Sequence, residues 1–275
     1  MRLSAGRWAL EAAPEQGGAV LSLTRAGRDV LRPTPAVIAD SFDVACFPLV
    51  PYANRIARGA FAWESCSWQI PRNHPDQTHP LHGVGWLKPW LTLTASATRA
   101  SMRLTHRGDE HWPWAFTAEQ RLELSPAGLA ATLEIANDDS RTMPISLGFH
   151  PYFAMAEALT FDAGGVWLAD GDMLPVRRAK ADALGDWGSG GALGRPDLID
   201  HCYTGWRGRA TIARDDGDIV LEAVGASELH VFVPPGEAFF CAEPVTAMPD
   251  AVNRGQAASL APGEQMRVEM TIRDA

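Results

Sequence analysis

The stretch FTAEQRLELSPAGLAATLEI, residues 116–135, contains two runs in which apolar and polar side chains alternate. The apolar positions are Phe116, Ala118, Leu122 and Leu124 in the first run, and Leu129, Ala131, Leu133 and Ile135 in the second. A period of two is typical of a β-strand. The segment between the runs, Ser125 to Gly128, carries Pro and Gly as a turn signal. The stretch therefore predicts a β-hairpin.

The same period recurs elsewhere in the chain. Residues 211–223 indicate another hairpin around residues 215–218, and residues 266–272 alternate near the C-terminus. Helical periodicity is not sustained, and 20 prolines and 25 glycines are spread throughout. We expect an all-β fold, with residues 1–275 as one large antiparallel β domain. Strand periodicity alone leaves a sandwich, a jelly roll and a propeller open. The Gly-rich residues 185–194 are expected to form a surface loop.

Composition excludes some classes of function. The net charge of −9 argues against nucleic-acid binding, which needs a basic face. The first residues lack the apolar core of a signal peptide, and no apolar run is long enough for a membrane span. The four cysteines form no CxxC pair, which argues against a structural zinc site. We therefore expect a cytoplasmic protein with free thiols, with no nucleic-acid or membrane partner.

Four short motifs carry side chains that suit a polyhydroxylated ligand. They are PYANRI with Gly59 (from residue 51), LHG (81–83), GFHPYF (148–153) and CAEP (241–244), and the side chains are Arg55, His82, His150 and Glu243. A histidine and a carboxylate from distant segments can together move protons in a reversible ring opening. The motifs therefore indicate a sugar site.

His150 and Glu243 are the candidate acid and base. Pro151 favours an extended backbone at His150, as at a strand end. Glu243 follows Phe-Phe-Cys-Ala, and a desolvated carboxylate is a stronger base. Each also has a structural interpretation: His150 as a buried histidine bonded to a carbonyl, and Glu243 as one half of an ion pair at a strand end.

Other residues are candidates for holding the ligand. The guanidinium of Arg55 suits vicinal hydroxyls, and Asp200 could accept hydrogen bonds from them, unless these residues are a surface charge and a turn cap. Gly83 beside His82 leaves room for a sugar ring, and Trp86 could stack on it.

Three histidines, His74, His79 and His82, lie close together and suggest a metal site, but the prolines between them oppose rigid ligand spacing. We expect no metal and no cofactor.

Together with Asp200, the four motifs resemble the aldose 1-epimerase, or galactose mutarotase, family from about residue 17 to the C-terminus. The resemblance implies a large antiparallel β-sandwich of the galactose mutarotase (supersandwich) type. It implies a cofactor-free isomerase that interconverts α and β anomers of an aldose. It also implies that Glu243 is the general base, that His150 is the general acid, that His82 contacts the ring-oxygen region, and that Arg55 and Asp200 bind hydroxyls.

Departures from the family pattern keep alternatives open. Residues 82–86 read HGVGW, without the two glycines that usually follow the histidine, and residues 149–153 read FHPYF. Hexose-6-phosphate 1-epimerases share the fold, but here the nearest cations are Lys88 and Arg72. A non-catalytic sugar-binding module would need no acid–base pair, and a metal-dependent hydrolase would need rigid ligand spacing. The expected partner is a small-molecule sugar, and the protein is expected to be a monomer or homodimer.

Overall fold

The structure, a computed structural model, describes residues 1–275 and is built almost wholly from strands. It has 24 β-strands and five 3₁₀ helices of three or four residues each. The helices are η1 (Ser41–Asp43), η2 (Ala57–Gly59), η3 (Gly85–Leu87), η4 (Ala181–Leu184) and η5 (Ala251–Arg254). None of them has the length or apolar character needed to cross a membrane. The predicted all-β class is confirmed.

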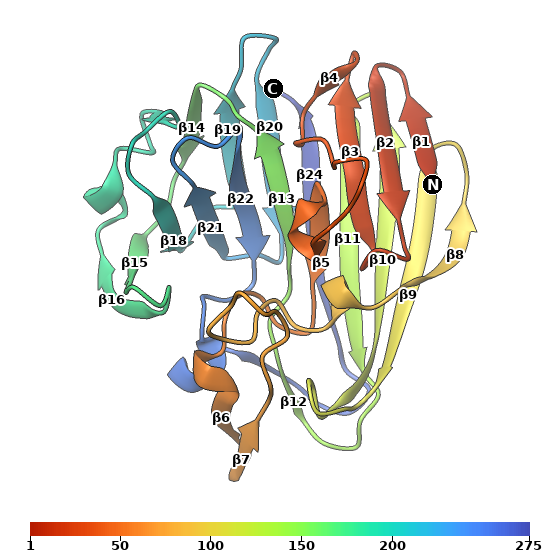
Figure 1. The fold of residues 1–275 in the computed structure, drawn as a ribbon, viewed down its shortest axis with the longest axis vertical. Helices are drawn as coiled ribbons and strands as arrows, with labels where there is room; N and C mark the ends of the chain where they lie inside the picture. The colour runs from red at the N-terminus through yellow and green to blue at the C-terminus, as the bar shows by residue number, and fades with distance from the viewer.

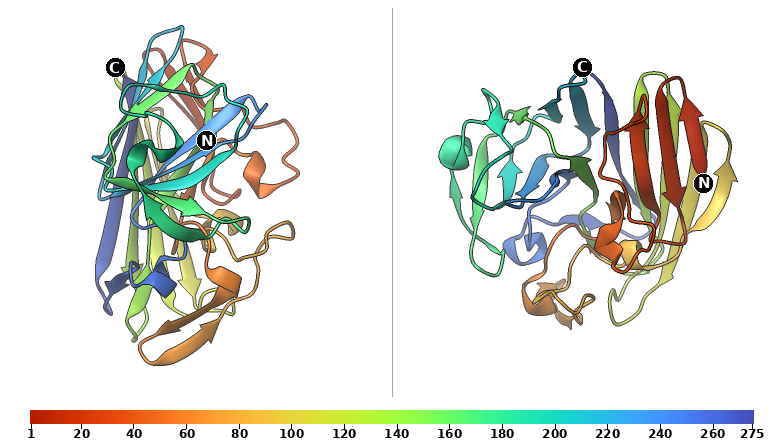
Figure 2. Two further views of the ribbon diagram at one scale, coloured as in Figure 1. Left: turned by 90° about the vertical axis from the view of Figure 1, so that its left-hand side faces the viewer. Right: turned by 45° about the horizontal axis from the view of Figure 1, so that its top comes forward.

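Two large antiparallel sheets pack against each other as a sandwich (Figures 1 and 2). The 11-stranded sheet runs β1 (Arg2–Ala5), β2 (Trp8–Ala13), β3 (Ala19–Arg25), β5 (Cys46–Leu49), β13 (Gly148–Ala154), β22 (Phe239–Val245), β21 (Glu228–Val233), β18 (Ile199–Thr204), β15 (Gly165–Ala169) and β16 (Pro175–Ala179), with β4 (Arg28–Asp29) beside β3. The nine-stranded sheet runs β17 (Gly191–Ala192), β14 (Ala158–Phe161), β19 (Arg209–Ala213), β20 (Ile219–Val224), β24 (Gln265–Asp274), β11 (Gly128–Asn137), β10 (Ala115–Ser125), β9 (Arg99–Arg107) and β8 (Leu91–Ala95). Two small pairs are β6 (Ala60–Trp63) with β7 (Cys66–Gln69), and β12 (Met143–Ile145) with β23 (Ala258–Leu260).

The predicted hairpins are present. Strands β10 and β11 pair from Phe116 to Ser125, and Ser125 lies opposite Gly128 at the turn. Strands β19 and β20 form the second hairpin, and β24 joins both hairpins into the nine-stranded sheet. Residues 185–194 are mostly an exposed loop, as expected, but Trp187 within it is buried and donates its indole N–H to the hydroxyl of Tyr203 at 2.6 Å. An aromatic ring that packs on Phe161 at 5.5 Å draws this segment onto the core.

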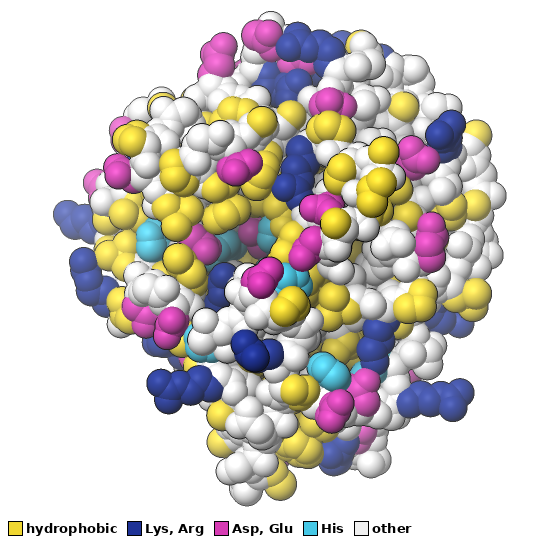
Figure 3. All heavy atoms as spheres, in the orientation of Figure 1, with side chains coloured by type: hydrophobic (Ala, Val, Ile, Leu, Met, Phe, Trp, Pro, Cys, Tyr) yellow, Lys and Arg dark blue, Asp and Glu magenta, His cyan; other side chains and the backbone are white.

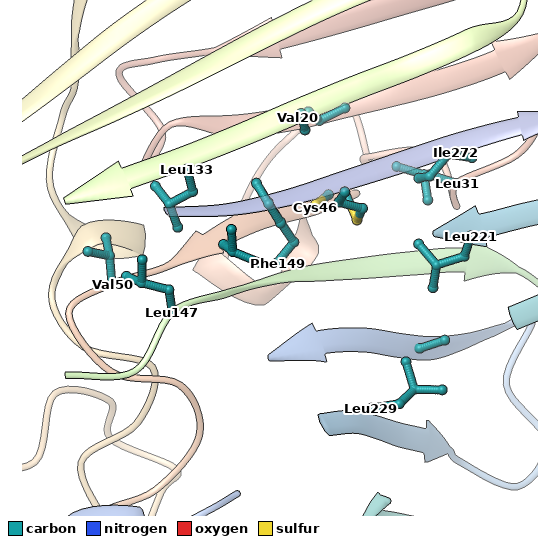
Figure 4. Close-up of a cluster of buried hydrophobic side chains, with 14 of the residues drawn as sticks. Val20, Leu31, Cys46, Val50, Leu133, Leu147, Phe149, Leu221, Leu229 and Ile272 are labelled. Carbon is teal, nitrogen blue, oxygen red and sulfur yellow. The ribbon is translucent and has the colours of Figure 1, made fainter. Parts of the chain in front are cut away.

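The core lies between the two sheets, and this decides which side chains face outward. Figure 4 shows Phe149 of β13 among core side chains such as Leu133 of β11 and Ile272 of β24. Because successive side chains alternate across a strand, His150 and Tyr152 lie on the other face of β13. The same alternation turns Phe240 and Ala242 inward and Cys241 and Glu243 outward. The 11-stranded sheet therefore carries its polar groups on its outer face.

Two loop segments, residues 50–55 and 81–83, are joined by backbone contacts beside that outer face, at the lower end of the sheet in Figure 1, and are called the locked loops below. Val50 forms a bridge with Gly83, and Arg55 forms one with Leu81. The backbone N–H of His82 also donates to the carbonyl of Asn54 at 2.9 Å. Gly83 has φ +71°, and a Cβ on it would lie 2.3 Å from the Val50 carbonyl oxygen. This close approach holds Arg55 and His82 in place.

We predict that Gly83→Ala lowers the free energy of unfolding far more than Gly27→Ala. Gly27 has a similar φ of +78°, but a Cβ there would meet nothing within 4 Å. The control should therefore lose only the backbone preference, roughly 1–2 kcal/mol. Gly83→Ala must also force the two loops apart, so its loss should exceed that of the control by about 2 kcal/mol or more. Urea denaturation measures both, and equal losses would show that the loops are not locked as described.

Candidate active site

A cleft of about 250 Å³ opens on the outer face of the 11-stranded sheet. Figure 3 shows this hollow, with histidine and acidic side chains inside a rim that includes hydrophobic atoms. The cleft is lined by Arg32, Phe42, Asn54, Arg55, Gln77, Leu81, His82, His150, Tyr152, Asp200, His230, Phe232, Phe239 and Glu243. Five of the six residues predicted from the sequence are among them. The sixth, Trp86, is not.

His150 and Glu243 meet at the floor of the cleft. They come from the adjacent strands β13 and β22, and Nε2 of His150 lies 3.4 Å from Oε1 of Glu243. Both side chains are almost fully buried. The His150 ring packs against the rings of Phe47 and Tyr152, at centroid distances of 4.7 and 4.6 Å. His150 Nδ1 and Glu243 Oε2 are buried atoms without a hydrogen-bond partner in the protein.

Burial pushes the proton affinities of this pair in opposite directions. Desolvation raises the pKa of Glu243 to about 8, although the charge on His230 opposes the rise. Desolvation, with the charges on His230 and Arg32, lowers the pKa of His150 to about 3. Between these values the pair holds one proton, which these two pKa values place on Glu243. Groups with displaced pKa values in a cleft are typical of acid–base sites.

Asp200 and His230 form a second buried pair beside the first. His230 Nε2 lies 2.6 Å from Asp200 Oδ1. Burial alone would lower the pKa of His230, but the hydrogen bond to Asp200 and the charge of Glu243 together raise it. Burial would likewise raise the pKa of Asp200, but His230 and then Arg55 lower it overall. Both shifts favour the ion-pair form, and Asp200, which lies within β18, is not a turn cap.

Arg55 and His82 project from the locked loops. Arg55 Nη1 lies 4.0 Å from Asp200 Oδ2 and 3.2 Å from Asn54 Oδ1, and its Nη2 lies 3.4 Å from Gln77 Oε1. His82 Nδ1 accepts the Asn54 backbone N–H at 3.1 Å, so the ring proton is on Nε2. Burial and the nearby His150 lower the pKa of His82, so it is a neutral donor. Its ring stands edge-on to His150 at 5.0 Å.

Trp86 lies behind the wall of the cleft. Its side chain is 2% exposed and stacks on Phe42 at 4.8 Å and on Phe47 at 5.3 Å. Its indole N–H donates to the carbonyls of Leu81 and Gly83. Trp86 thus supports Phe42 and the His82 loop. The aromatic side chains that do line the cleft are Phe42, Tyr152, Phe232 and Phe239.

Sequence reasoning missed Arg32, Gln77 and His230. Arg32 donates to the carbonyls of Phe42 and Val44, and its guanidinium lies 3.6 Å from the centre of the Tyr152 ring. His230 occupies a period-two position with Phe232 in β21, so it could have been assigned to the outer face once the order of the strands was known. Nothing in the residues around Arg32 or Gln77 distinguishes them from loop residues.

Two groups of side chains could in principle hold a metal ion. His150, Cys241 and Glu243 offer ligand atoms within 4.8 Å of one another, and so do Asp40, His74 and Asp76. In the first group Cys241 does not line the cleft, and an ion there would occupy the acid–base pair. In the second, His74 and Asp40 already bond to each other at 2.9 Å. All four cysteines are free, as expected.

A buried imidazole–carboxylate pair in a cleft on a β-sandwich is an arrangement that can support acid–base chemistry. The chain belongs to the aldose 1-epimerase family, whose pattern matches residues 3–273. It is 30% identical to the uncharacterized protein YphB of Escherichia coli K12, covering 94% of this chain and 93% of YphB.

Solved structures agree with this family assignment. The crystal structure of a candidate aldose 1-epimerase from E. coli K12 superposes with a TM-score of 0.91 at 30% identity, covering 99% of this chain and 97% of that one. A galactose mutarotase-like protein from Clostridium acetobutylicum has the same fold, with a TM-score of 0.85 at 20% identity, covering 98% and 93%. The predicted sandwich of the galactose mutarotase type is therefore confirmed.

We predict that Glu243→Gln stabilises the fold, and does so more at pH 9 than at pH 5. Glu243 has a folded pKa of about 8 against an ordinary 4.5. Its contribution to stability is therefore present below pH 4.5 and is lost as the pH rises to about 8, by on the order of 4 kcal/mol. Glutamine cannot ionise, so it avoids this loss. Denaturation at both pH values measures the effect, with the exposed Glu237→Gln as control, and a pH-independent difference would contradict it.

Proposed function

We propose that the protein is an aldose 1-epimerase that interconverts the α and β anomers of an aldose by acid–base ring opening at His150 and Glu243. The observation that supports this most strongly is the contact between these two side chains, 3.4 Å apart, on the floor of a sugar-sized polar cleft. The two oxygens of a cyclic hemiacetal are bonded to one carbon, so the groups that act on them must lie close together.

The proposed reaction needs one proton on the pair. For the reaction this proton must lie on His150, the less favoured of its two positions in the free protein. Glu243, then ionised, removes the proton from the C1 hydroxyl while His150 donates one to the ring oxygen. The bond between C1 and the ring oxygen breaks, C1 becomes an aldehyde, and rotation about C1–C2 presents its other face. Closure by the reverse transfers gives the second anomer and restores the pair. The neutral His82 Nε2–H is a donor toward the same region.

Other residues of the cleft would hold the sugar. Arg55 and Asp200 present charged donor and acceptor groups to hydroxyls, and Phe42, Tyr152, Phe232 and Phe239 offer apolar faces. Neither Lys88 nor Arg72 lines the cleft, and Lys88 is paired with Asp109 at 2.7 Å. These two cations therefore give no support to the hexose-6-phosphate alternative. A sugar-binding module without activity remains the alternative that kinetics must exclude.

We predict that Glu243→Gln and His150→Asn each reduce kcat by roughly 10²–10⁴-fold, because each removes one partner of a concerted proton transfer. The double variant should be little worse than the worse single one. Polarimetry on freshly dissolved α-glucose, α-galactose, arabinose and glucose 6-phosphate measures the rate. A Glu243→Gln protein with near wild-type activity on the best sugar would contradict the mechanism.

We predict that Arg55→Ala raises KM by about 10–100-fold and changes kcat much less, because the guanidinium binds hydroxyls equally in the ground and transition states. Arg58→Ala is the matched control, since Arg58 is three residues away and exposed. Steady-state polarimetry separates the two constants. A collapse of kcat at unchanged KM would mean that Arg55 acts on the reacting atoms instead.

A further inference from the structure

His230 has no part in the proton transfers proposed above, yet it lies against the groups that make them. It stands directly opposite Glu243 in the pairing of β21 with β22. It is 4% exposed and lines the cleft. Its Nε2 is bonded to Asp200, while its Nδ1 has no partner in the protein. A positive charge on this imidazole would therefore lie next to Glu243.

We propose that His230 is a positioning residue: Asp200 holds it in its charged form, and its fixed positive charge sets the pH range in which the His150–Glu243 pair carries one exchangeable proton. The proposal concerns these residues in the free protein and rests on the proposed function only for its consequence in the rate. It gives Asp200 a second role besides binding hydroxyls.

The surroundings of His230 contain charges of both signs, from four parts of the fold. The titratable and charged groups on the same face of the sheet as His230 are Asp200 and Cys202 of β18, Glu243 and Cys241 of β22, His150 of β13, and Arg55 and His82 of the locked loops. His201 of β18 lies on the opposite face. Burial lowers the pKa of His230, but the hydrogen bond to Asp200 and the charges of Glu243 and Asp200 together outweigh burial and the repulsion from Arg55, so the pKa is raised. These contacts favour the charged form of the His230 ring.

The sign of the effect is the same for both members of the catalytic pair. A positive charge favours loss of a proton from any neighbour, and the charge on His230 lowers the pKa of both Glu243 and His150. Without it, the pair would hold its last proton to a higher pH and would accept a second proton more readily. The whole window would move upward, by roughly one to three pH units for a close charge.

The test is an NMR titration of the free protein with ¹³C-labelled glutamate carboxyls and histidine rings. The Glu243 signal is identified by its absence from Glu243→Gln. In the wild type, we expect the His230 ring to be protonated at pH 7 and the Glu243 carboxyl to titrate near pH 8. In His230→Gln, which keeps a donor for Asp200 but no charge, the Glu243 titration should move up by one unit or more. In His230→Lys, which keeps the charge, it should stay near the wild-type value.

Three results would overturn the proposal. The first, which needs no variant, is a neutral His230 ring at pH 7 in the wild type. The others are a Glu243 titration that does not move in His230→Gln, or one that moves equally in His230→Gln and His230→Lys. His201→Gln is the matched control, and it should leave the Glu243 titration unmoved.

Polarimetry then measures the rate of mutarotation, and the pH at which this rate declines on the alkaline side should move upward in His230→Gln alone. A structural role would lower the rate without moving that decline. Absence of mutarotation with any sugar would reject the proposed function while leaving the NMR result valid.

Discussion

The burial of Glu243 beside His150 is the constraint around which the cleft is organised. A carboxylate that is 2% exposed is costly to ionise, and no protein hydrogen bond reaches its Oε2. The protein therefore gives up stability at high pH in order to keep a strongly basic group next to an imidazole. Stability lost at a site in exchange for reactive groups is a common feature of active sites.

The sandwich supplies the rigidity that this arrangement needs. Because β13 and β22 are paired strands in the middle of a sheet of 11, the backbone at His150 and Glu243 is held by the core that Phe149 and Phe240 fill on the inner face. The less regular parts of the cleft come from loops, and these are fixed by backbone bonds such as His82 to Asn54 rather than by strand pairing. Rigid strands thus carry the His150–Glu243 pair, and the locked loops carry Arg55 and His82, the residues proposed to contact a ligand.

Much of this could be predicted from the sequence, and the limits have physical causes. Residues 116–135 were assigned correctly because a period-two pattern reports one strand locally. His150, Glu243, Arg55, His82 and Asp200 were found through short motifs, and all five line the cleft. Trp86 was expected to stack on a sugar, but its place behind Phe42 depends on how the loops fold back. His230 was missed because its importance arises from the strands beside it, which local sequence does not specify.

The most direct test of the central claim is two-dimensional exchange NMR of an aldose at anomeric equilibrium, recorded with the wild-type protein and a chelator between pH 5 and pH 10. The account predicts protein-dependent exchange between the α and β anomeric signals, at a rate that is steady through neutral pH and declines above about pH 8 as the buried pair loses its proton. A protein-dependent exchange rate that rises steadily from pH 8 to pH 10, or that depends on an added metal ion, would contradict the account.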